Sequence, residues 1–112
     1  MSVPKYGRVT PLQMDMLGLG GEICLWYQQR PPTDDERTKE MRSSREVLQR
    51  LTGLDFGYDL EAWHERLLSD QQYSEQYTHP YAWEAVKPKI LELIKDPNRL
   101  RLVQIIEQAD QA

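Results

Sequence analysis

Five helix-start signals are spaced along the chain, and they limit its fold more than any other feature does. They stand at Thr10, Thr33, Asp59, Thr78 and Asp96. At these residues a hydroxyl or carboxylate can accept hydrogen bonds from the free N–H groups of a first helical turn. Apolar residues recur every three or four positions after the signals, which is the period of an α-helix. We therefore expect an all-α fold, a compact bundle of four to five helices.

The first three predicted helices have clear apolar faces. One begins at Thr10-Pro11 and ends at Pro31-Pro32, one runs from the capping box of Thr33 and Glu36 to Thr52-Gly53, and one begins after Asp59. Their buried faces are expected to be, in order, Leu12, Met16, Leu19, Ile23 and Trp26; Met41, Val47, Leu48 and Leu51; and Leu60, Trp63 and Leu67. Residues 1–9 show no period, so we expect an extended lead to a single helical domain that spans 1–112.

The last part of the chain is less regular. Residues 69–77 are polar with interspersed tyrosines, so they are left without a predicted element and are expected to be the most exposed stretch. A helix after Thr78 should turn Ala82, Trp83 and Val86 inward, and Pro88 either kinks or restarts it. A final helix after Asp96 is expected to bury Leu100, Val103 and Ile106, with Leu102 as a further candidate.

The charge of the chain is concentrated in one segment. Residues 54–84 carry seven acids and one arginine, a net charge of −6, whereas the whole chain carries −4. The same segment holds seven of the ten aromatic residues. An acidic region repels phosphate backbones, so we expect no nucleic-acid ligand there, and the mixed charges of residues 33–53 give only weak support to an RNA-binding role for their arginines.

Acids beside tyrosines are instead typical of a surface that binds a basic protein. The residues predicted to contact such a partner are Tyr58, Asp70, Tyr73, Glu75, Tyr77 and Tyr81. A second interpretation stays open, in which the aromatic side chains form the core and the acids face water.

The sequence offers little to catalysis or metal binding. Cys24 lies among apolar neighbours, which favours an inert thiol over a nucleophile, and His64-Glu65 lacks the second histidine of a zinc-protease motif. We therefore expect no catalytic residues, no metal site and no cofactor. A small metal-binding protein or enzyme that uses His64 and His79 remains the alternative, although their spacing is not diagnostic.

The compartment is predicted from three absences in the sequence. No apolar run approaches the ~20 residues of a membrane span, and no secretory signal is visible at the start. A single cysteine cannot form an internal disulfide, which is typical of proteins in reducing compartments. We expect a cytoplasmic protein that does not enter a membrane.

Residues 52–63 carry the one resemblance to a known family. They read Thr-Gly-Leu-Asp-Phe-Gly-Tyr-Asp-Leu-Glu-Ala-Trp, and this motif resembles one at the ends of bacterial HEAT-like repeat proteins, where it links two helices. The resemblance covers about a tenth of the chain and implies a HEAT-like helical scaffold with a binding role. The sequence departs from the family after Trp63, where further aromatics are replaced by His64-Glu65-Arg66, and it contains no internal repeat of 35–45 residues.

These observations together predict a bacterial, non-catalytic protein-interaction domain. One concrete form is an immunity-type inhibitor that masks a basic toxin or effector with the acidic, aromatic segment. An accessory subunit that docks on a larger complex through the same segment is the alternative.

Overall fold

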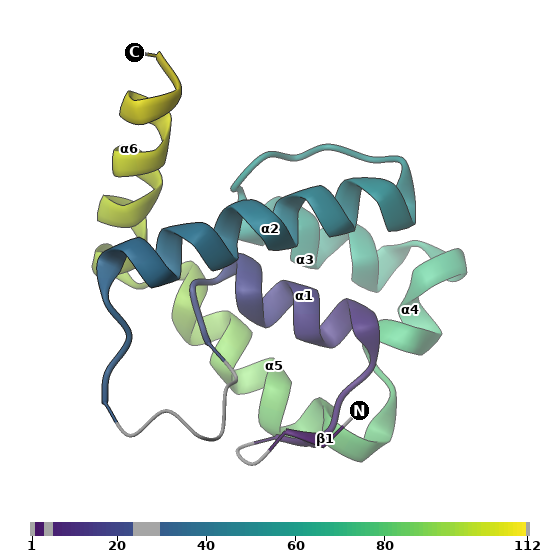
Figure 1. Cartoon of the computed structure of the whole chain (residues 1–112). Coiled ribbons are helices and arrows are strands. Elements are labelled where there is room, and N and C mark those ends of the chain that lie inside the picture. Colours follow the sequence, from purple (N-terminus) through teal and green to yellow (C-terminus); the bar gives the residue numbers. More distant parts are fainter. Residues whose placement is uncertain (1, 4–5, 24–29, 112) are drawn as a thin grey trace.

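The computed structural model describes residues 2–3, 6–23 and 30–111, and within these residues the chain forms six helices and one short pair of strands (Figure 1). The helices are α1 (Pro11–Leu19), α2 (Asp34–Thr52), α3 (Leu60–Ser69), α4 (Gln71–Tyr77), α5 (Pro80–Ile94) and α6 (Pro97–Gln111). The strands β1 (Ser2–Val3) and β2 (Gly7–Arg8) pair antiparallel inside the predicted extended lead. The all-α class and the compact packing are confirmed, with six helices in place of four to five.

The predicted capping residues begin four of these helices. Thr10 accepts a hydrogen bond from the N–H of Gln13, and Thr33 and Glu36 form the reciprocal hydrogen bonds of a capping box. Asp59 accepts from the N–H of Ala62 at 3.1 Å, and Asp96 accepts from the N–H of Asn98 at 2.9 Å. These contacts satisfy N–H groups that a helix start leaves without partners, which fixes where each helix begins.

The first helix is much shorter than predicted. It ends at Leu19, because Gly20 forms its cap and Gly21 adopts a positive φ of 89°, which a side chain would strain. Gly20 also lies so close to Leu93 of α5 that a Cβ atom there would overlap the leucine. The prediction that the helix continues to Pro31-Pro32 is therefore wrong; Ile23 lies beyond its end, and Trp26 lies outside the described residues.

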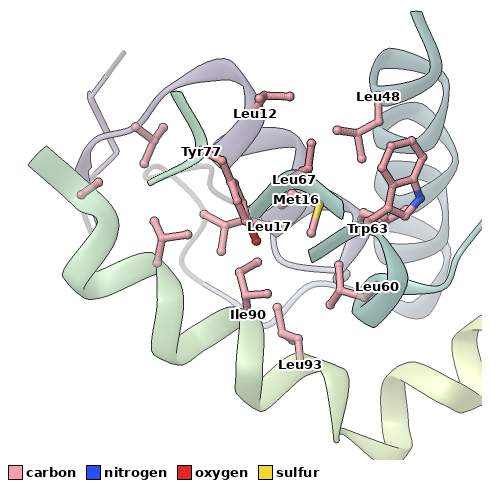
Figure 2. Packing of buried hydrophobic residues seen from close by; sticks show 14 of the residues in the cluster. Leu12, Met16, Leu17, Leu48, Leu60, Trp63, Leu67, Tyr77, Ile90 and Leu93 are labelled. Carbon is pink, nitrogen blue, oxygen red and sulfur yellow. The ribbon is translucent and has the colours of Figure 1, made fainter. Parts of the chain in front are cut away.

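The main core surrounds α1, which contacts α2, α3, α4 and α5 (Figure 1). Figure 2 shows its buried side chains, which come from α1 to α5: Leu12, Met16, Leu17, Leu48, Leu60, Trp63, Leu67, Tyr77, Ile90 and Leu93. Pro88 lies inside α5, which continues through it to Ile94. Each fully buried aliphatic or aromatic side chain stabilises the fold by about 1.5–3 kcal/mol relative to leaving it in water.

The C-terminal helix rests on a second, smaller cluster. Met41 of α2 packs with Leu102 and Ile106 of α6, with Tyr58 and Val103 at its edge. In Figure 1, α6 rises from the N-terminal half of α2 and extends beyond the other helices. The prediction that Leu100 is buried is wrong, because Leu100 lies on the other side of α6 and is 53% exposed.

The polar stretch that received no predicted element forms α4. Asp70 ends α3 and begins α4, since its carboxylate accepts a hydrogen bond from the N–H of Gln72 at 2.9 Å. Tyr77 is the buried residue of this helix and inserts into the main core (Figure 2). Tyr73, one turn earlier, is the other residue of this helix that packs against the core, and one pair of tyrosines among polar residues is too little to establish a helical period.

Candidate functional site: a groove beside the C-terminal helix

Residues 53–59 form a rigid connector between α2 and α3. Gly53 caps α2 with a φ of 71°, and Gly57, with a φ of 59°, donates its N–H to the Asp55 carboxylate at 2.8 Å. The indole Nε1 of Trp63 donates to the carbonyl of Gly57 at 3.0 Å, and the Phe56 ring meets the Trp63 ring edge to face at 5.0 Å between centroids. The Thr-Gly-Leu-Asp-Phe-Gly-Tyr-Asp sequence therefore builds a fixed loop that holds Phe56 and Tyr58 in place.

Tyr58 lies where the connector meets α2 and α6. It packs against both hydrophobic clusters, and the guanidinium of Arg45 lies over its ring, 4.9 Å from the centroid. Arg45 is also paired with Asp55 at 3.3 Å, which raises the pKa of Arg45 and helps to lower that of Asp55. The ring of Tyr58 is thus held between the Arg45 guanidinium and the hydrophobic clusters, and it remains half-buried.

Arg99 fastens the start of α6 to the connector and to α1. Its guanidinium is buried and donates hydrogen bonds to the carbonyl of Tyr58 at 2.6 Å and to that of Leu19 at 3.1 Å. Burial lowers the pKa of Arg99 to about 10, so the side chain stays charged at neutral pH. Hydrogen bonds from a charged donor are worth about 1.5–3 kcal/mol, and these two set the position of α6 beside the connector.

A groove of about 750 Å³ runs between the connector and α6. Its apolar lining comes from the connector and the starts and ends of three helices: Phe56, Tyr58, Leu60, Ile94, Leu100 and Val103. Its charged lining consists of four acids, Asp59, Glu61, Glu107 and Asp110, and of two arginines, Arg45 and Arg99. An open groove that combines aromatic and aliphatic side chains with a few charges is typical of a binding site.

The electrostatic character of the groove is negative. Both arginines are already engaged, Arg45 by Asp55 and Arg99 by two backbone carbonyls. On the acidic side, Asp110 is paired with Arg42 at 2.6 Å, whereas Glu61 and Glu107 are exposed and make no ion pair with another described residue. The groove can therefore attract a cationic group more readily than an anionic one.

The predicted partner residues are distributed over three places. Tyr58 lines the groove. Tyr73 and Glu75 belong to α4, and Asp70 caps its start. Figure 1 shows α4 on the opposite side of the molecule from α6. There Asp70 is a helix cap, Tyr73 donates its hydroxyl to the carbonyl of Thr52 at 3.1 Å, and Glu75 is exposed.

Tyr81 and Tyr77 have opposite environments. Tyr81 is 69% exposed, lies beside His79, and has the guanidinium of Arg8 over its ring at 5.7 Å. Tyr77 is fully buried, so the prediction that it contacts a partner is wrong. The reason is a polar contact inside the core, where the hydroxyl of Tyr77 and Nδ1 of His64 lie 2.7 Å apart.

His64 and His79 do not share a site. Burial lowers the pKa of His64 and raises that of Tyr77, so their hydrogen bond joins two neutral groups. The ring of Trp83 stacks on His64 with centroids 6.4 Å apart, whereas His79 contacts Tyr81. Within the described ranges no group of three or more His, Cys, Asp and Glu side chains is placed to hold a metal ion, and Cys24 lies outside these ranges.

The α6 side of the groove was missed by the reasoning from the sequence. The sequence pattern predicts one buried face that includes Leu100 and Val103, and it predicts no role for Glu107. A signal was present, because the apolar residues of α6 are too widely distributed for one face: Leu100, Leu102, Val103, Ile105 and Ile106. Such a distribution indicates a helix with contacts on more than one side.

Comparison of the chain with known protein families, with curated proteins and with solved structures finds no match. The resemblance of residues 52–63 to HEAT-like repeat proteins stays a prediction. No helix in the described part of the chain is long and apolar enough to cross a bilayer. The groove is consequently the feature from which a function can be inferred.

Proposed function

We propose that the protein is a non-catalytic interaction domain that binds a basic partner protein at the groove between the connector and α6. The observation that carries this proposal is the lining of the groove, in which half-buried aromatic side chains lie beside exposed, unpaired carboxylates. The groove includes Tyr58, Asp59 and Glu61 from the acidic, aromatic segment 54–84, and this overlap supports the proposal, although Tyr58 is the one predicted partner residue that lines it.

The physical roles of the two kinds of residue differ. Aromatic and aliphatic side chains such as Tyr58 and Leu100 supply the area that a partner buries, and a few such residues usually dominate binding energy. Carboxylates such as Glu61 and Glu107 accelerate the encounter with a basic surface and select against acidic competitors. The connector is fixed by hydrogen bonds before binding, which reduces the ordering cost that a partner must offset.

An immunity-type inhibitor of a basic toxin or effector is the concrete form that we favour. A small acidic domain can cover a basic substrate-binding surface without any chemistry of its own. An accessory subunit of a larger complex would use the same groove. The two are separated by the activity of the isolated partner, which the domain should inhibit in the first case and leave unchanged in the second.

The test is affinity capture with matched charge-reversal variants. Tagged wild type, the double variant Glu61→Lys/Glu107→Lys and the control Glu75→Lys are incubated with lysate of the cells that encode the protein. Glu75 is an equally exposed acid, but it lies on α4. We expect a basic protein to be recovered by wild type and Glu75→Lys and to be lost with the double variant, with circular dichroism establishing that all three are folded.

Two outcomes would contradict the proposal. Retention of the partner by the double variant would exclude the groove. Loss with Glu75→Lys alone would place the interface on α4, beside Asp70 and Tyr73, where most of the residues that the sequence predicts for the partner surface lie.

A further inference from the structure

One wall of the groove is a helical ridge. On α6 its lining residues are Leu100, Val103, Glu107, Asp110 and Gln111, which follow one another at helical spacings of three and four before the last step. The eleven steps from Leu100 to Gln111, at a rise of 1.5 Å each, extend about 16 Å along the axis. The other wall is formed by residues 56–61 of the connector and the start of α3. A trough of this length accommodates about three turns of a second helix.

The walls do not present the continuous backbone edge that an extended peptide would need. On one side, α6 is a continuous helix, so its backbone groups bond within the helix along most of the wall. On the other side, the carbonyl of Gly57 accepts from Trp63 and that of Tyr58 accepts from Arg99. Peptides that bind as an added strand need unpaired N–H and C=O groups, which favours a helix as occupant here.

The charges on the two walls select the occupant further. Glu61, beside Asp59, lies on the connector and α3 wall, and Glu107 lies on the α6 wall, one helical turn beyond Val103. Among the described lining residues the four acids outnumber the two arginines, Arg45 is paired with Asp55, and Arg99 is buried against two backbone carbonyls, all of which disfavours an anionic ligand. An occupant with an apolar stripe and positive charges on both sides of that stripe is complementary to this arrangement.

We infer that the groove binds an amphipathic helix of the partner, with apolar residues at i, i+3 or i+4 and i+7 and with Lys or Arg on both flanks of that stripe. This inference rests on the proposed function and specifies the partner's binding element. Its apolar stripe covers Leu100, Val103 and Tyr58, and its cations approach Glu61 and Glu107. Packing of one helical ridge between the ridges of another is the ordinary geometry of such contacts.

The probe is a displayed library of 18-residue peptides with a helix-forming backbone sequence, randomised along one face and its two flanks. Selection on immobilised wild-type protein should enrich apolar residues at the stripe positions and Lys or Arg on both flanks. The best peptide is then measured by fluorescence anisotropy against wild type, Leu100→Lys and the control Leu91→Lys. Leu91 is 41% exposed on α5 and does not line the groove. We expect Leu100→Lys to weaken binding at least tenfold and Leu91→Lys to change it less than twofold.

Three results would overturn the inference: no enriched peptide, enrichment without a basic flank, or equal binding to wild type and Leu100→Lys. The capture experiment separates this failure from a failure of the proposed function. A partner that depends on Glu61 and Glu107 while the peptides fail would leave the function standing and exclude the helix. A partner that ignores these acids would exclude the proposed function even if a peptide binds.

Discussion

The indole nitrogen of Trp63 donates a hydrogen bond to the carbonyl of Gly57, six residues earlier, so that α3 and the connector form one unit. The Trp63 ring is fully buried and lies edge to face with Phe56. Replacement by alanine should lower the free energy of unfolding by about 3–5 kcal/mol, because it removes the ring and leaves a cavity. Trp63→Phe should cost less, since it keeps most of the ring and loses the hydrogen bond, worth about 1 kcal/mol. Urea denaturation measures both, and near-normal stability of the alanine variant would contradict this packing.

The contact between α1 and α2 depends on the absence of a side chain at Gly18. A Cβ atom there would overlap Oγ of Ser44 and would lie 3.2 Å from its Cβ. Gly18→Ala should therefore destabilise the fold by about 1–3 kcal/mol. The penalty should shrink in the Ser44→Gly background, and a double-mutant cycle should give a coupling energy of about 1 kcal/mol or more. In the exposed Ser43→Gly background the penalty should be unchanged; equal penalties in all backgrounds would disprove the steric explanation.

The pH dependence of stability should include a contribution from Asp15. Burial and the charge of Glu40 raise the pKa of Asp15 to about 6, against a partial opposite effect of Arg50. Between about pH 4 and 6 the native state holds a proton that the unfolded chain has released, so the free energy of unfolding falls as pH rises through this window. Asp15→Asn should consequently be more stable than wild type at pH 7, and its advantage should disappear towards pH 4.

The stability gain expected for Asp15→Asn is reduced because water screens the partly exposed carboxylate. A pKa of about 6 in place of the usual 3.8 corresponds to roughly 3 kcal/mol, but Asp15 is only partly buried, so we expect about 1 kcal/mol. Chemical denaturation at pH 4, 5, 6 and 7 measures the difference. Glu75→Gln, which neutralises an exposed acid, is the control and should shift stability little at any of these pH values. A constant difference for Asp15→Asn across the series would contradict the assignment.

The buried pair of His64 and Tyr77 should be visible in two variants. Tyr77→Phe removes the hydroxyl and leaves the histidine nitrogen without its partner, which should cost about 1–3 kcal/mol. The matched change at the exposed residue, Tyr81→Phe, should stay within about 0.5 kcal/mol. Thermal and urea denaturation of both proteins test this, and equal effects at the two positions would place Tyr77 at the surface.

Local signals in the sequence predicted the elements that depend on neighbouring residues. Thr33 and Glu36 form their capping box, Asp59 begins α3, and Trp63 and Leu67 are buried as their spacing indicates. The capping interactions close within three residues, and the burial of Trp63 and Leu67 follows from a helical period that a short stretch of sequence carries.

The misassigned residues depend on contacts across the chain. Tyr77 is buried because α4 folds back on His64, thirteen residues earlier, and Leu100 is exposed because Arg99 ties α6 to Leu19, eighty residues away. A period of three or four residues carries no information on such distances. The sequence predicts only the Tyr58 side of the groove, because its two walls come from segments that are about forty residues apart in the chain.

The small size of the cluster beneath α6 has a dynamic consequence. Met41, Leu102 and Ile106 form a cluster of their own that meets the main core through Tyr58, so we expect α6 to open more readily than α1 to α5. Its central amides should exchange with deuterium through a sub-global opening of lower free energy than those of α1. Because one wall of the groove is then absent, the apparent affinity for a partner scales with the fraction of molecules in which α6 is closed. Binding would in turn slow exchange in α6, which makes this helix a direct reporter of occupancy.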